Sequence, residues 1–197
     1  IPDVYAKASP YVFENNMVKD DGLWLEFGVY VGGTINRMAL YTNKTDIIYG
    51  FDSFEGLPDD WHGRVDPNGS VYLKGLFNLG GHIPVVAPNV TLVKGWYKDV
   101  LPGFIATHNK PIVFIHMDCD IYPSTVDVFE CLHQNIANGC IIAFDELVGY
   151  NGFENHEWKA WWEFVEKYNI TYEWIGGNRS GEIRPNPTGA PPFDRFR

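Results

Sequence analysis

Apolar runs and amphipathic stretches alternate along this chain, which is the pattern of strands followed by helices. Short apolar runs predict five strands, at Leu23–Phe27, Ile47–Phe51, Asn89–Lys94, Pro111–Met117 and Cys140–Phe144. Stretches with apolar residues three or four positions apart predict helices at Val4–Lys19 (broken near Pro10), Thr34–Thr42, Tyr97–Thr107, Ser124–Ala137 and Asn155–Tyr168. Strands that alternate with helices predict a parallel sheet covered on both faces.

Local signals refine the boundaries of these elements. Ser124 and Asp127 have the spacing of a capping box, and Asn138-Gly139 predicts the end of the same helix. Two short stretches, 170–175 and 182–184, are expected to pair as a C-terminal antiparallel hairpin. The predicted fold class is therefore α/β, a single doubly wound and mostly parallel sheet with helices on both faces and a C-terminal antiparallel hairpin.

Residues 53–88 break the periodicity. The segment is rich in Gly and Pro, and Trp61, Tyr72 and Phe77 are scattered through it. A loop of this length inside a compact domain is usually functional, so we expect a lid or substrate loop, with a surface insertion carrying a short helix as the alternative. We expect one domain over 1–197, with a helical N-terminal segment at 1–20 and a Pro-rich tail at 185–197.

Composition narrows the class of protein. The chain has 197 residues, which suffices for one domain with a sizeable core, and its net charge of −10 argues against nucleic acid as a partner. No apolar run reaches the length that spans a membrane. The three cysteines are an odd number at no zinc spacing, which fits a reducing, cytoplasmic location. The sequence leaves the oligomeric state open, with a homo-oligomer as one option.

The turn after the first predicted strand has the chemistry of a cofactor site. Glu26 is followed by Gly28, Gly32 and Gly33, and then by a helical pattern. Glycines allow the backbone to approach a ligand, and a helix start offers free N–H groups. The spacing differs from Gly-x-Gly-x-x-Gly and suits a cofactor that carries an amino acid better than a pyrophosphate. A plain Gly-rich turn explains the residues equally well.

Acidic residues follow four of the predicted strands. Glu26 and Asp52 end the first two, Asp118 and Asp120 follow the fourth, and Asp145 with Glu146 follows the fifth. Ligands bind at this edge of a doubly wound sheet. Asp52 lies where a ribose-binding acid belongs, although a turn-capping Asp is the alternative.

Three of these acids predict a metal site. Asp118, Asp145 and Glu146 offer hard oxygen ligands from neighbouring strand ends, which suits Mg²⁺, or Ca²⁺ or Mn²⁺, better than zinc. Helix-capping acids that face water are the alternative.

Four stretches carry a family resemblance: 25–33 (LEFGVYVGG), 50–58 (GFDSFEGLP), 93–97 (VKGWY) and 116–125 (HMDCDIYPST). Together they resemble the macrocin O-methyltransferase family of class I S-adenosylmethionine-dependent enzymes, which includes macrolide-sugar and novobiocin-type sugar O-methyltransferases. The resemblance covers roughly residues 20 to 150. It implies a Rossmann-like methyltransferase fold, S-adenosylmethionine as cofactor, a bound Mg²⁺, and a sugar or natural-product hydroxyl as small-molecule acceptor.

The resemblance also implies residue roles. It implies that the cofactor is bound by Glu26, Gly28, Gly32, Thr34, Asp52, Ser53, Phe54, Gly95, Trp96 and Asp118. Asp118 would be both a metal ligand and the catalytic base, and Asp145 and Glu146 would complete the metal site. The chain has Asp-Glu at 145–146 where the family usually has Asp-Asp. The longer Glu side chain moves the ion or binds it with both oxygens.

Two histidines lie near the predicted acids in the sequence, and two other functions are alternatives to methyl transfer. We expect His116 to be a packed or hydrogen-bonded residue pointing to the other face of the strand from Asp118, and His156 to be a helix residue that is a weaker alternative base. A nicotinamide-dependent oxidoreductase would need the absent Gly-x-Gly-x-x-Gly motif. A non-catalytic cofactor-binding module would leave acids buried at strand ends without use, at a cost in stability.

Overall fold

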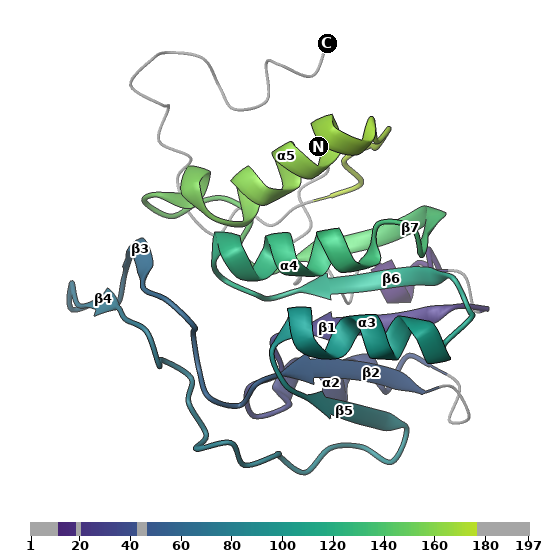
Figure 1. Cartoon of the computed structure of the whole chain (residues 1–197), viewed down its shortest axis with the longest axis horizontal. Coiled ribbons are helices and arrows are strands. Elements are labelled where there is room, and N and C mark those ends of the chain that lie inside the picture. The colour runs from purple at the N-terminus through teal and green to yellow at the C-terminus, as the bar shows by residue number, and fades with distance from the viewer. Residues whose placement is uncertain (1–11, 19–20, 43–46, 177–197) are drawn as a thin grey trace.

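A five-stranded parallel sheet forms the centre of the molecule (Figure 1). The computed structural model describes residues 12–18, 21–42 and 47–176. The strands lie in the order β5-β2-β1-β6-β7, and every neighbouring pair is parallel. Their bounds are Leu23–Phe27 (β1), Ile48–Asp52 (β2), Val90–Lys94 (β5), Ile112–Met117 (β6) and Ile136–Phe144 (β7). The predicted parallel α/β sheet is confirmed.

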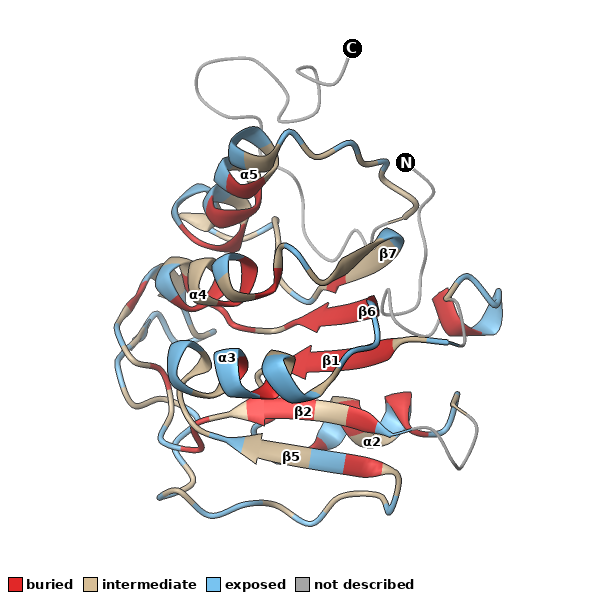
Figure 2. Cartoon of the chain, turned by 45° about the vertical axis from the view of Figure 1, so that its right-hand side comes forward, coloured by how far each residue is buried: buried red, intermediate tan, exposed pale blue. Residues whose placement is uncertain are grey.

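Helices cover both faces of this sheet, as predicted. Helices α3 (Tyr97–Thr107), α4 (Tyr122–Leu132) and α5 (Glu157–Tyr168) contribute Phe104, Phe129 and Phe164 to one apolar core. The short helix α2 (Gly33–Met38) packs Ile35 and Met38 into a second core on the opposite face. Every residue of β1 and β6 is buried, which explains why these strands read as continuous apolar runs (Figure 2).

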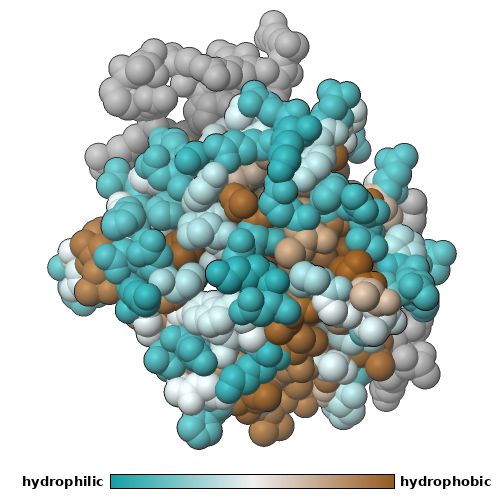
Figure 3. Space-filling view, viewed as in Figure 1, coloured by the Kyte–Doolittle hydropathy of each residue, from teal (hydrophilic) through white to brown (hydrophobic). Residues whose placement is uncertain are grey.

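The 53–88 segment contains a small antiparallel ribbon instead of the short helix of the alternative interpretation. Strands β3 (Trp61–Val65) and β4 (Val71–Tyr72) pair with each other and stand apart from the main sheet (Figure 1). Several large apolar side chains of the segment are exposed, among them Leu73, Ile83 and Val85. In Figure 3 hydrophobic patches interrupt the hydrophilic surface along the left and lower margins, where Figure 1 places this segment.

Two predicted boundaries around α4 are wrong. The helix begins at Tyr122, with Pro123 in its first turn and no side-chain cap, so Ser124 and Asp127 lie inside the helix and form no capping box. It ends at Leu132, and residues 136–144 form β7 where the sequence predicted more helix. Asn138-Gly139 marks an irregularity in the β6–β7 pairing, where Gly139 has a φ of +79°, and not the helix end.

The two ends of the chain bear on the remaining predictions. The stretch 170–176 forms no strand within the described residues, and its expected hairpin partner at 182–184 lies outside them, as do residues 1–11 and the tail. The predicted helix at 155–168 divides into a 3₁₀ turn, η1 (Phe153–Asn155), and α5. Among the helices of the described ranges, none has both the length and the apolar character needed to cross a membrane.

Candidate active site

A cavity of about 270 Å³ lies at the carboxyl ends of the parallel strands. Its wall combines the turns after β1, β2, β5, β6 and β7 with residues of the β3–β4 ribbon. Of the ten residues predicted to bind the cofactor, six line it: Gly28, Asp52, Ser53, Gly95, Trp96 and Asp118. Ligands of doubly wound folds bind at this edge. Six of the ten predicted residues therefore share one cavity at this edge of the sheet.

The other four predicted cofactor residues do not line this cavity. The side chain of Phe54 is fully buried in the core beside α2, and Gly32 and Thr34 belong to the start of α2, farther along the loop. Glu26 lies inside β1 and is 1% exposed. The ring of Phe54 packs among apolar side chains, and its role in binding the cofactor stays a prediction.

Asp52 organises the loop that carries the glycines. Its Oδ2 accepts hydrogen bonds from the backbone N–H groups of Val29 (2.9 Å) and Tyr30 (2.8 Å), and its Oδ1 accepts one from Phe54 (2.7 Å). A carboxylate has about four acceptor positions, so three are filled by backbone groups. Asp52 thus ties the turn after β1 to the end of β2, as the capping alternative anticipated, and still lines the cavity.

Gly28 is required by a close approach between two strands. Its φ is +90°, and a Cβ atom there would collide with the carbonyl oxygen of Asp118. The amide of Asp118 in turn donates to the carbonyl oxygen of Phe27 (2.9 Å). The glycine therefore brings the turn after β1 directly against the residue predicted to be the base.

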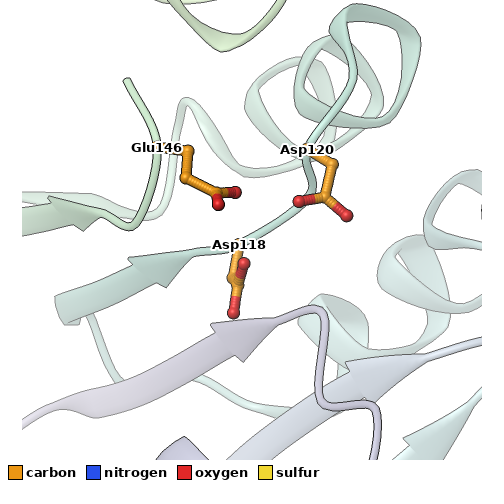
Figure 4. A group of neighbouring side chains, drawn as sticks. All are labelled: Asp118, Asp120 and Glu146. Atoms are coloured by element: carbon orange, nitrogen blue, oxygen red, sulfur yellow. The ribbon is translucent and has the colours of Figure 1, made fainter. Parts of the chain in front are cut away.

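An acidic group forms the floor of the cavity. Asp118, Asp120 and Glu146 each present a carboxylate oxygen, and these atoms lie within 4.8 Å of one another (Figure 4). The structure brings Asp118 and Glu146 together as the sequence predicted, but it adds Asp120 in place of Asp145. Asp120 has a φ of +66°, and with this left-handed backbone its carboxylate lies near those of Asp118 and Glu146 (Figure 4). Asp145 lines the cavity outside this group.

Burial and mutual repulsion change how this group holds protons. Burial raises the pKa of Asp118 to about 8; the charge of His116 opposes that rise, and the charges of Asp145, Glu146 and Glu26 add to it. The pKa of Asp120 rises well above its ordinary value through burial and the charge of Asp118. Carboxylic acids crowded in this way keep protons at neutral pH unless a cation is present.

His116 and Glu26 form a buried pair behind this floor. They are register partners of β6 and β1, and His116 Nδ1 lies 3.0 Å from Glu26 Oε1. His116 Nε2 lies 3.9 Å from Asp145 Oδ1. Burial lowers the pKa of His116, but the bond and charge of Glu26 outweigh this and raise it overall.

The contacts of His116 confirm its hydrogen-bonded role and correct its expected orientation. Side chains two positions apart on a strand share a face, and His116 is two residues before Asp118. The side chain of His116 therefore lies on the same face of the strand as that of Asp118.

His156 has the structural role that the sequence favoured. It is buried, its Nε2 donates to the carbonyl oxygen of His62 (2.7 Å), and burial lowers its pKa. It does not line the cavity. It fastens the β3–β4 ribbon to the start of α5, and as a base it has no access to an acceptor held above Asp118.

Arg64 is a cavity residue that the sequence reasoning missed. Its Nη2 lies 3.0 Å from Glu146 Oε1, and its guanidinium lies over the rings of Trp61, Tyr72 and Tyr150 at 5.2, 5.9 and 4.9 Å. It stands 82 positions before its partner, so no local spacing could connect the two. The aromatic residues of the segment, noted in the sequence, were the available signal.

The donor set fits a hard divalent cation. Mg²⁺ holds oxygen ligands at about 2.0–2.1 Å and Ca²⁺ at about 2.3–2.6 Å, so ligands on opposite sides of the ion stand about 4–5 Å apart. The spread of the Asp118, Asp120 and Glu146 oxygens, 4.8 Å, matches this range at its wide end. The residues present therefore fit a hard divalent cation, which Asp118, Asp120 and Glu146 would hold through carboxylate oxygens.

A family model and several known proteins are similar to this chain. The sequence model of the macrocin-O-methyltransferase (TylF) family matches residues 82–175. The resemblance to the macrocin O-methyltransferase family is confirmed. The matched region contains both acidic turns, at 118–120 and 145–146, whereas the glycine turn and Asp52 precede it. The family match therefore covers the part of the candidate site that contains the two acidic turns.

A curated relative from Streptomyces olivaceus is 28% identical over 137 residues. It is 8-demethyl-8-(2,3-dimethoxy-alpha-L-rhamnosyl)-tetracenomycin-C 4'-O-methyltransferase. The alignment covers 62% of this chain and 51% of the relative, so the chain spans about half the length of the curated protein that it matches.

Solved structures of methyltransferases share the fold. The calicheamicin methyltransferase CalS11 superposes with a TM-score of 0.58 at 24% identity, over 87% of this chain and 75% of its own. The O-methyltransferase NovP gives 0.57 at 23% identity, over 87% and 73%. These similarities establish a shared architecture.

Proposed function

We propose that this chain is an S-adenosylmethionine-dependent O-methyltransferase that acts on a hydroxyl of a sugar or another secondary-metabolite acceptor, with Mg²⁺ assistance. The observation that carries the proposal is one cavity that joins a nucleoside-type edge (Gly28, Asp52 and Trp96) to an acidic floor (Asp118 and Glu146). The family match and the activity named for the Streptomyces relative support it.

The cofactor and the metal divide the chemistry with the protein. When bound, S-adenosylmethionine supplies an activated methyl group, and a divalent cation makes an alcohol hydroxyl more acidic. Asp52 remains the proposed ribose ligand, through its remaining acceptor position or by exchanging a backbone partner. Glu26 is proposed to interact with the methionine end of the cofactor through the glycine-rich turn after β1. Its Oε2 is buried and has no hydrogen-bond partner within the described residues.

Asp118 is the proposed general base. It lines the cavity at the end of β6, against the glycine turn, so an acceptor oxygen above it also lies near the cofactor edge. When the acceptor oxygen bonds to the methyl carbon, the sulfonium C–S bond would break and release S-adenosylhomocysteine, and Asp118 Oδ would take the hydroxyl proton. A base with a pKa of about 8 is largely protonated at neutral pH, so a neighbouring cation is needed to release it. Asp118, Glu146 and either Asp120 or Asp145 are proposed to hold that cation.

Substitution of the base tests this mechanism. Asp118→Asn keeps the side-chain shape but removes the base and an anionic ligand, so turnover should fall by about 10² or more with cofactor affinity nearly unchanged. The assay measures methyl transfer from S-adenosylmethionine to sugar, phenol and carboxylate acceptors, with Mg²⁺ and with EDTA. Asp99→Asn removes the same charge from an exposed turn of α3 and serves as control.

The possible outcomes separate the claims. Loss of transfer in EDTA and recovery with Mg²⁺ would support the metal. Full activity in EDTA would reject the metal and leave the methyltransferase assignment intact. Full activity of Asp118→Asn would reject Asp118 as the base.

A further inference from the structure

Arg64 is the single Lys, Arg or His among the residues that line the cavity, at least within the described part of the chain, and five carboxylates share that lining with it. Those acids are Asp52, Asp118, Asp120, Asp145 and Glu146. Arg64 is therefore the basic side chain of a cavity whose other ionisable lining is mainly acidic. Its only salt bridge there, among described residues, goes to Glu146, a proposed metal ligand.

The guanidinium is held firmly in place. It lies over three aromatic rings, of Trp61, Tyr72 and Tyr150, at distances that allow cation–π attraction. The side chains of Arg64 and Glu146 are each 27% exposed, so their ion pair is only partly screened by solvent. The Nε of Arg64 is buried with no hydrogen-bond partner in the described residues. Arg64 is a built part of the cavity and not a passing surface contact.

The β3–β4 ribbon that carries Arg64 is fastened to the segment after Glu146. His156 Nε2 donates to the carbonyl oxygen of His62 at 2.7 Å, and Trp61 Nε1 donates to the hydroxyl of Tyr150 at 3.3 Å. Gly63 lies so close to Asn151 that an added Cβ would come 2.6 Å from the Asn151 carbonyl oxygen. The backbone just before Arg64 is therefore tied to residues 150–156, which follow closely after Glu146.

We propose that Arg64 is a positioning residue that occupies Glu146 as a resident counter-cation, so that a divalent cation binds only by displacing it and thereby loosens the β3–β4 ribbon. The inference rests on the proposed metal site. A divalent ion shared by Glu146 and Asp118 would sit within a few ångströms of the guanidinium, and like charges at that distance repel strongly in a partly buried site. By linkage, if Arg64 weakens metal binding, a bound metal weakens the contact of Arg64 with Glu146 by the same free energy.

Calorimetric titration of the protein with Mg²⁺, without cofactor or acceptor, tests the proposal. Arg64→Gln should bind Mg²⁺ about tenfold more tightly than the unchanged protein, the order expected when a unit charge about 5 Å from a divalent ion is removed. Arg37→Gln removes an exposed charge from the last turn of α2 and should leave the affinity unchanged. A residue needed only for folding would lower Mg²⁺ affinity when replaced, so the direction of the change is diagnostic.

Hydrogen exchange gives the reciprocal measurement. Mg²⁺ should speed exchange of ribbon amides in the unchanged protein and leave it unaltered in Arg64→Gln. Unchanged or weaker Mg²⁺ binding by Arg64→Gln would overturn the proposal, as would a failure of the unchanged protein and Arg64→Gln alike to bind Mg²⁺. If Arg64→Gln does not fold, Arg64→Lys replaces it, with a smaller gain in affinity expected and no gain contradicting the proposal. Methyl transfer that persists in EDTA would leave the proposed enzyme standing while this inference fails.

Discussion

Asp52 shows how one residue serves the fold and the site at once. Three backbone N–H groups, of Val29, Tyr30 and Phe54, depend on its carboxylate. Asp52→Ala should therefore weaken binding of S-adenosylhomocysteine by roughly 1.5–3 kcal/mol, the usual size of charge-assisted hydrogen bonds. It should also lower the free energy of unfolding, because the three donors lose their partner.

Calorimetry and urea unfolding separate these two effects. Asp21→Ala, an exposed acid before β1, is the matched control and should change neither quantity. An Asp52→Ala protein that is destabilised but binds S-adenosylhomocysteine normally would restrict Asp52 to its structural role.

The sequence predicted those residues of the candidate site that directly follow a strand. Gly28, Asp52 and Asp118 each follow an apolar strand, and the carboxyl ends of parallel strands necessarily share an edge. Asp120 could not be chosen over Asp145, because the choice depends on a left-handed turn at 120 that sequence spacing does not specify. Arg64 was missed because its partner lies on a segment that is remote along the chain.

At the scale of elements, strands were easier to predict than helix ends. The first strand was located at the observed residues, because β1 is buried on both faces and four of its five residues are apolar, Glu26 being the exception. The end of α4 was misjudged because Ile136 and Ala137 continue an apolar pattern that suits a helix or a strand. Ile136 pairs with Ile112 of β6 and is therefore part of a strand. This is a tertiary contact, which the local sequence pattern does not show.

The 53–88 segment is proposed to act as a lid over cofactor and acceptor. It supplies Trp61, Arg64 and Tyr72 to the cavity wall, and it exposes apolar side chains such as Ile83 and Val85. Protease cleavage within this segment should slow when S-adenosylhomocysteine is added, because a closed lid presents less accessible backbone. Cleavage followed by mass spectrometry measures this. Equal rates with and without the ligand would leave a passive insertion.

For the whole molecule, the buried acids predict how stability depends on pH. Asp118 keeps its proton up to a pKa of about 8 in the folded chain, against about 3.9 when unfolded. Between these values the folded state binds more protons than the unfolded state, so the free energy of unfolding should fall as pH rises from 4 to 8. The raised pKa of His116 acts in the same direction.

Urea unfolding in EDTA at several pH values measures this slope. Asp118→Asn should flatten it, and Mg²⁺ should restore stability above pH 7 by compensating the ionised carboxylates. Stability that rises steadily from pH 4 to 8 in EDTA would show that the acids are not held as the structure places them.

The central claim is that the cavity at the carboxyl ends of the strands binds S-adenosylmethionine. Calorimetric titration with S-adenosylhomocysteine tests it without requiring the acceptor to be known, and NAD⁺ is the matched competitor for a doubly wound fold. We expect saturable binding of one S-adenosylhomocysteine per chain, weakened by Asp52→Ala, and no binding of NAD⁺. Binding of NAD⁺ with none of S-adenosylhomocysteine would contradict it.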